Sequence, residues 1–137
     1  MAALFKFEVY TPYRRFFSGQ AQAVTLTLTD GDITILANHA FCAAPVVPGF
    51  LRIKDEGGTW KNAFVSEGII EVKGHNTILL TDTAEWPEEI DRDRALEAHA
   101  AALDAINSSM FKFESAAAEA ALTRARLRIK VKDEGNA

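Results

Sequence analysis

Four charged residues in the C-terminal part of the chain have the spacing of an anion-binding site. Asp91 and Arg94 are three positions apart, and Arg124 and Arg128 are four positions apart, so the members of each pair are neighbours on a helix. Two guanidinium groups between two such helices could donate bidentate hydrogen bonds to a phosphate. The alternative interpretation is that Asp91 caps a helix and the arginines form a solvated basic face, because paired surface charges are common and weak.

Positive charge is concentrated near the end of the chain. Five cations occur within nine residues there: Arg124, Arg126, Arg128, Lys130 and Lys132. The chain as a whole carries a net charge of −4, so these cations are segregated from an otherwise acidic protein. They indicate either a surface for an acidic partner or a soluble helix end whose cations favour the helix dipole.

The remaining reactive residue types do not form the pattern of an enzyme. His39, His75 and His99 are far apart and have no partner cysteines, which makes a zinc site improbable. No phosphate-binding GxxxxGK[ST] loop occurs, and no nucleophile has an activating base nearby. His39 lies in a predicted loop. Two interpretations are open: it is a packed or solvated loop residue, or it contacts a partner. We read the pair Glu88 and Glu89 as solvated.

Short alternating segments separated by turns occupy the first two thirds of the chain. Residues 23–29 alternate apolar and threonine side chains, and Asp30-Gly31 then predicts a hairpin turn. Gly19 is predicted to form a turn between two further strands. Trp86-Pro87 ends the last strand, because proline supplies no hydrogen-bond donor to a sheet. Many short strands with closely spaced turns indicate an all-β sandwich or barrel.

From Asp91 onward the apolar period is that of helices, and alanine dominates. The first predicted helix carries an apolar stripe of Leu96, His99, Leu103 and Ile106. The second, over about 113–131, carries a stripe of Ala118, Leu122, Ala125 and Ile129. Asn107-Ser108-Ser109 interrupts the pattern, so an antiparallel α-helical hairpin is predicted. Alanine buries little area, at ~25 cal/mol per Å². We therefore expect an arm that docks or detaches at a cost of a few kcal/mol.

Composition limits the classes of protein to consider. The 137 residues suit one domain, or one domain with an appendage. The net charge of −4 argues against general nucleic-acid binding, and no run of about 18 apolar residues could span a membrane. The N-terminus lacks the layout of a signal peptide, and the single cysteine, Cys42, fits a reducing cytoplasm.

Several short motifs, taken in order, resemble a known family. They are Thr11-Pro12, Phe17-Ser18-Gly19, residues 30–36 (DGDITIL), Asn38-His39-Ala40, Pro48-Gly49, Phe64-Val65-Ser66, residues 80–84 (LTDTA) and residues 90–95 (IDRDRA). The ordered set is similar to the epsilon subunit of bacterial rotary F-type ATP synthase. The resemblance implies an all-β N-terminal sandwich of about ten strands over residues 1–86. It also implies a two-helix regulatory domain over residues 87–137.

The resemblance implies partners as well as a fold. The sandwich would bind the gamma subunit and the c-ring, with Asp32 and His39 as matching contact residues. The helical arm would extend along gamma and inhibit ATP hydrolysis, while Arg124, Arg126 and Arg128 meet an acidic segment of the catalytic beta subunits. Such a non-catalytic central-stalk subunit couples proton-driven rotation to gamma. It would sit in the bacterial cytoplasm, on the inner face of the plasma membrane, and touch the membrane only through the complex.

Some members of that family also bind ATP in the folded-down hairpin. The matching residues here are Glu85, Ile90, Asp91, Arg94, Ala95, Arg124 and Arg128. One further arginine of nucleotide-binding members falls on Ala101, which predicts weaker ATP affinity or none. No cofactor is required. An ATP-sensing binding module is therefore the second hypothesis, and a small hydrolase is the third.

Overall fold

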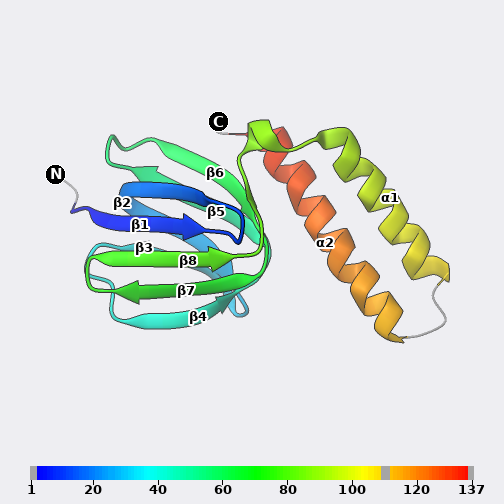
Figure 1. Cartoon of the computed structure of the whole chain (residues 1–137), viewed down its shortest axis with the longest axis horizontal. Helices are drawn as coiled ribbons and strands as arrows, with labels where there is room; N and C mark the ends of the chain where they lie inside the picture. The colour runs from blue at the N-terminus through cyan, green and yellow to red at the C-terminus, as the bar shows by residue number, and fades with distance from the viewer. Residues whose placement is uncertain (1–2, 109–111, 136–137) are drawn as a thin grey trace.

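The computed structural model describes residues 3–108 and 112–135, except for the side chains of residues 112–114. These residues form nine strands, one short 3-10 helix and two α-helices. The strands are β1 (Phe5–Tyr10), β2 (Arg15–Leu28), β3 (Gly31–Leu36), β4 (Cys42–Val46), β5 (Gly49–Asp55), β6 (Trp60–Val65), β7 (Gly68–Lys73), β8 (Asn76–Thr81) and β9 (Ala84–Glu85). The helices are η1 (Pro87–Glu89), α1 (Arg92–Ser108) and α2 (Lys112–Glu134). Figure 1 shows the helical hairpin beside the strands, with α2 next to them and α1 outside.

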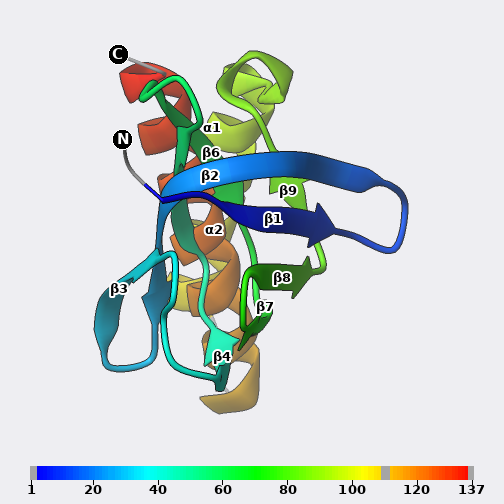
Figure 2. The ribbon, with the colours of Figure 1, turned by 90° about the vertical axis from the view of Figure 1, so that its left-hand side faces the viewer.

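The strands form one sheet that folds back on itself as a sandwich. The first half of β2 pairs with β1 and its second half pairs with β3 and β5. β1 also pairs in parallel with β8, which is followed by β7 and β4. Apolar side chains from both layers meet inside and are fully buried, among them Phe7, Leu26, Leu51 and Leu79. Figure 2 shows β1 and β2 side by side, with the helices behind the sandwich.

The predicted all-β sandwich followed by a helical hairpin is confirmed, but the predicted turn at Gly19 is wrong. Gly19 lies inside the 14-residue strand β2 and pairs with Phe7 of β1. A shift in register between Ala21 and Ala23 supplies the bend that lets one strand serve both layers. Two expected strands are therefore one, and the described residues contain nine strands rather than about ten.

The hairpin begins where the sequence predicts. The Asp91 carboxylate accepts a hydrogen bond from the backbone N–H of Arg94 at 3.1 Å, which makes Asp91 the N-cap of α1. α1 ends at Ser108, within the predicted interruption, while Ser109 lies outside the described residues. Neither helix, over the residues described, is long and apolar enough to cross a membrane.

The predicted stripe of α1 is only partly protected from solvent: His99 and Ile106 are half-buried. Leu96 and Leu103 are 40% and 38% exposed, whereas Ala95 and Ala102 are buried. The facing stripe of α2 is also built on alanine, with Ala118 and Ala125 buried, as predicted for that helix. The two alanine faces allow the helix axes to approach closely, and the neighbouring leucines are turned outward as a result.

Candidate functional site: the cavity beneath the helical hairpin

A small apolar cluster holds the hairpin against the sandwich. Phe64 of β6, Ile90 of the linker and Val131 of α2 are its buried members, and Phe50 and Leu127 pack around them. This cluster is separate from the main core between the two layers. The hairpin therefore docks through a limited apolar contact.

Polar contacts surround the apolar cluster. The Arg124 guanidinium lies 3.4 Å from the Glu67 carboxylate, and the Arg128 Nε donates to Glu85 at 2.7 Å. The Arg128 guanidinium also lies 4.6 Å from the centre of the Phe64 ring. The Lys132 ammonium donates to the Pro87 carbonyl at 2.9 Å. Such partly exposed ion pairs contribute roughly 0–1 kcal/mol each to the free energy of docking. They therefore affect the orientation of the hairpin more than the strength of its attachment.

The linker before α1 is fixed to the sandwich at its first half. Arg14, from the β1–β2 connection, donates to the Glu89 carboxylate at 2.8 Å and to the Ala84 carbonyl at 3.2 Å. Glu89 also accepts a hydrogen bond from the Trp86 backbone N–H. The Trp86 ring stacks on Phe16 with ring centres 4.4 Å apart. Movement of the arm would thus start after Glu89 rather than at the end of the last strand.

Glu89 corrects one expectation from the sequence, because its carboxylate is bound rather than simply solvated. The hydrogen bond from Arg14 lowers the pKa of Glu89 below its ordinary value. The same contact raises the pKa of Arg14. The charged pair therefore ties η1 to the β1–β2 connection near neutral pH.

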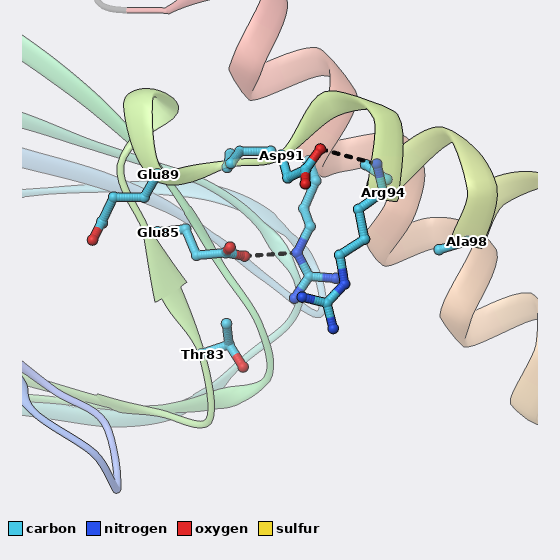
Figure 3. Close-up of a pocket in the computed structure, with 9 residues that line it drawn as sticks. Thr83, Glu85, Glu89, Asp91, Arg94 and Ala98 are labelled. Carbon is cyan, nitrogen blue, oxygen red and sulfur yellow. Dashed lines mark hydrogen bonds and ion pairs between the residues drawn. The ribbon is translucent and has the colours of Figure 1, made fainter.

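A cavity of about 420 Å³ lies where β9, the linker, α1 and α2 meet. Its lining residues are Thr83, Glu85, Glu89, Ile90, Asp91, Arg94, Ala95, Ala98 and Arg128. Figure 3 shows the Glu85 and Arg94 side chains extending into this region, the Asp91 carboxylate turned toward the Arg94 backbone, and Glu89 pointing away from them. Arg94 forms no ion pair within the described residues, so its guanidinium is available to a ligand.

The structure brings together six of the seven residues expected at a nucleotide site. Glu85, Ile90, Asp91, Arg94, Ala95 and Arg128 line the cavity, while Arg124 lies outside and pairs with Glu67. Ala101, where an arginine is missing, is exposed on α1. Three further residues line the cavity that the sequence analysis did not predict: Thr83, Glu89 and Ala98. Of these, only Ala98 could have been found from the sequence, because it lies one helical turn after Arg94.

The expected partner-contact residues do not form one cluster. Asp32 is the second residue of β3, and His39 follows the far end of the same strand. The His39 Nδ1 lies 2.8 Å from the Ala40 carbonyl oxygen, and the Asp32 carboxylate accepts a hydrogen bond from Thr27. Arg126 is exposed on the flank of α2 opposite the cavity described above. Within the described residues, no group of His, Cys, Asp and Glu side chains could hold a metal ion.

Two family models together match nearly the whole chain. The beta-sandwich domain of the ATP synthase delta/epsilon chain matches residues 4–87. The long alpha-helix domain of the same chain matches residues 88–133. The chain belongs to the ATP synthase delta/epsilon chain family. Its members named epsilon chain are non-catalytic subunits of ATP synthase, so a small hydrolase is no longer a candidate.

Curated relatives extend over the same length. The ATP synthase epsilon chain of Caldanaerobacter subterraneus subsp. tengcongensis is 42% identical over 132 residues, covering 96% of this chain and 95% of the relative. The ATP synthase epsilon chain of Clostridium novyi is 40% identical over 131 residues, covering 96% of this chain and 99% of the relative. The similarity therefore includes both the sandwich and the hairpin.

Solved structures share the fold at low sequence identity. A chain in the Euglena gracilis mitochondrial ATP synthase (OSCP/F1/c-ring) has a TM-score of 0.79 at 22% identity, covering 98% of this chain and 81% of that one. A chain in the central stalk and c-ring of the Tetrahymena thermophila mitochondrial ATP synthase has a TM-score of 0.68 at 16% identity, covering 96% and 98%. These likenesses support the fold alone.

Proposed function

We propose that the chain is the central-stalk epsilon subunit of a proton-translocating ATP synthase and that its helical hairpin regulates ATP hydrolysis. The sandwich binds gamma and the c-ring, and the hairpin moves between a docked and an extended position. In this role the protein is peripheral to the inner face of the bacterial plasma membrane, which it reaches only through the complex.

The observation that carries this proposal is the limited contact between hairpin and sandwich. Full burial of a side chain such as Val131 contributes about 1.5–3 kcal/mol, and the surrounding ion pairs add little. The balance between docked and detached positions is therefore within reach of a partner that binds one position better.

The docked position occupies two of the three arginines expected to meet the catalytic beta subunits. Arg124 and Arg128 pair with Glu67 and Glu85 of the sandwich, whereas Arg126 has no such partner. An acidic segment of a beta subunit would offer the same kind of carboxylate, so the two positions compete for one set of cations. Asp32 and His39 remain as proposed contacts of the sandwich with the c-ring end of the stalk.

A shortened chain in a reconstituted complex tests the regulatory role. The chain should end after Glu89, because Glu89 fixes the linker through Arg14. Complexes with the shortened chain should hydrolyse ATP severalfold faster than those with the full chain while ATP-driven proton pumping is retained. Equal hydrolysis by the two complexes would remove the inhibitory role, and lost pumping with both would remove the stalk assignment.

A second candidate function is sensing of ATP in the cavity beneath the hairpin. The observation that favours it is the convergence of Arg94 and Arg128 with Glu85 and Asp91 around one hollow between arm and sandwich. A ligand that touches both parts would stabilise the docked arm. Glu85 and Asp91 equal the two arginines in number, which limits the attraction for a triphosphate.

Thermal unfolding of the isolated chain with millimolar ATP tests this second candidate. ATP should raise the melting temperature, and Arg94→Gln should abolish the rise. Arg92→Gln is the matched control, because Arg92 is two positions away on α1 and pairs with Asp133 outside the cavity. No rise with the unmodified chain, or equal losses in both variants, would reject ATP sensing.

A further inference from the structure

A second cavity of about 420 Å³ lies on the other flank of α2. It opens between α2 and the layer formed by β2, β3 and β5. Three cations line it: Arg52 from β5, and Arg126 and Lys130 from α2. Asp32 is the acidic residue in the lining. The cavity is thus a second place where sandwich and hairpin face one another.

Two of the three cations in this cavity lie over one aromatic ring. The Arg52 guanidinium lies 4.8 Å from the centre of the Phe50 ring, and the Lys130 ammonium lies 5.6 Å from the same centre. Arg126 and Lys130 are four positions apart on the helix, a spacing at which like charges destabilise each other. Cation–π attraction of about 0.5–1 kcal/mol at an exposed ring offsets part of this repulsion.

No carboxylate of the described residues pairs with these cations. Arg52, Arg126 and Lys130 form none of the ion pairs found within 4.0 Å in the described part of the chain. The Asp32 carboxylate instead accepts a hydrogen bond from the Thr27 hydroxyl at 2.7 Å. Three cations against one carboxylate leave a formal excess of two positive charges in the lining.

The two cavities therefore differ in net charge. In the cavity beneath the linker, Glu85 and Asp91 balance Arg94 and Arg128, because Glu89 points away and pairs with Arg14. The cavity around Phe50 has an excess of positive charge. Guanidinium and ammonium groups without partners are donors suited to phosphate oxygens, which accept bidentate bonds from arginine. An oxyanion is thus accommodated better on the Phe50 side of α2 than in the cavity of the proposed nucleotide site.

We propose that Arg52, Arg126 and Lys130 form a binding site for a phosphate-type oxyanion with at least two negative charges. The anion would bridge β5 of the sandwich and α2 of the arm, so its binding would favour the docked position. Recognition would be by charge and by the paired N–H donors that each guanidinium group carries. Binding itself is a property of the isolated full chain, whereas its effect on the arm rests on the docked and detached positions proposed above.

Calorimetric titration of the isolated full chain with inorganic pyrophosphate tests the site. Orthophosphate, which has a single phosphate group, should bind more weakly. Arg52→Gln and Lys130→Gln should each weaken pyrophosphate binding about tenfold, because each removes one charged donor. Lys54→Gln is the matched control. Lys54 lies on the same strand, 6.0 Å from the Trp60 ring centre, and does not line the cavity. Arg94→Gln separates this site from the cavity beneath the linker.

The expected pattern is weakened binding in the Arg52 and Lys130 variants and normal binding in the Lys54 variant. Hydrogen exchange should also show slower exchange of α2 amides when pyrophosphate is bound, which Arg52→Gln should prevent. Absence of pyrophosphate binding, equal weakening by Lys54→Gln, or loss confined to Arg94→Gln would each overturn the proposal.

Discussion

The sandwich and the hairpin of this chain bury apolar surface in very different ways. The sandwich has a continuous core between its layers, with large side chains such as Phe7, Leu26 and Leu51 fully buried. The hairpin packs alanine on alanine within itself and meets the sandwich through a separate small cluster. Alanine removes far less apolar area from water than phenylalanine or leucine. This difference is what the proposed movement of the hairpin relative to the sandwich requires.

This comparison explains why polar contacts gather around the hairpin. Three cations of α2 contact the sandwich and the linker: Arg124 pairs with Glu67, Arg128 pairs with Glu85, and Lys132 donates to the Pro87 carbonyl. Such contacts have directional geometry and exchange readily with water or with another partner. A small apolar cluster with directional polar contacts around it gives the hairpin a defined position on the sandwich, as the proposed switch requires.

The largest effect is expected where the sandwich backbone is most crowded, at Gly68. A Cβ added to Gly68 would lie 2.0 Å from the backbone carbonyl oxygen of Leu80, so β7 and β8 would have to separate. Gly68→Ala should lower the free energy of unfolding by about 3 kcal/mol or more. Urea denaturation followed by circular dichroism measures the change.

Gly74→Ala is the control for Gly68→Ala. Gly74 has a φ of +62° but no neighbour within 4 Å of an added Cβ, so the cost is only that of a left-handed backbone, about 1–2 kcal/mol. If Gly68→Ala were no worse than Gly74→Ala, the sandwich would be more deformable than described, and its contrast with the hairpin would fail.

A smaller and more local effect is expected at the dock. Val131→Ala leaves a cavity beside Phe64 and should weaken docking by about 2 kcal/mol. Because a detached alanine hairpin is marginal in water, α2 amides should exchange roughly 30-fold faster. Hydrogen exchange followed by mass spectrometry or NMR measures both regions.

Amides of β1, β2 and β8 should keep their protection in the Val131→Ala variant. Leu103→Ala is the matched control, because Leu103 is 38% exposed and its truncation should change stability by less than about 0.5 kcal/mol. Equal loss of protection in the sandwich and the hairpin would show that the two regions unfold as one unit.

The smallest effect concerns the anchor of the linker and depends on pH. Arg14 lowers the pKa of Glu89, so this pair stabilises the fold above the ordinary glutamate value of 4.5, and the contribution is lost as the pH falls below it. Both side chains are about a third or more exposed, so the contribution is less than about 1 kcal/mol. NMR titration of the Glu89 carboxyl should show a pKa below 4.5.

Arg14→Gln provides the comparison for this titration. The Glu89 pKa should rise toward its ordinary value in the variant, because the hydrogen bond from Arg14 is the main reason that it is lowered. An unchanged Glu89 pKa would mean that Arg14 does not hold the linker, and the arm could then pivot from Trp86.

The sequence predicted the candidate site better than it predicted the packing around it. Helical spacing singled out Asp91 with Arg94 and Arg124 with Arg128, and the resemblance added Glu85. The structure brings all of these except Arg124 to one cavity. Glu89 was missed because its partner, Arg14, is 75 positions away in the chain, and local spacing carries no information about such a pair.

Errors in the fold have a similar origin. Gly19 has the composition of a turn, but its pairing with Phe7 across the sheet keeps it in β2. The stripes Leu96–Leu103 and Ala95–Ala102 are adjacent on α1, so periodicity could not say which one faces α2. The alanine face of α2 selects the smaller residues, and that choice depends on the partner helix.

By itself, the sequence determined the division into strands and helices, the cap at Asp91 and the weak alanine packing of the arm. These properties depend on residues close together in the chain, where spacing and side-chain chemistry act directly. The tertiary structure alone decided which face of each helix is buried, that Glu89 binds Arg14, and that cations gather around Phe50. Such features arise from groups distant in sequence that only packing brings together.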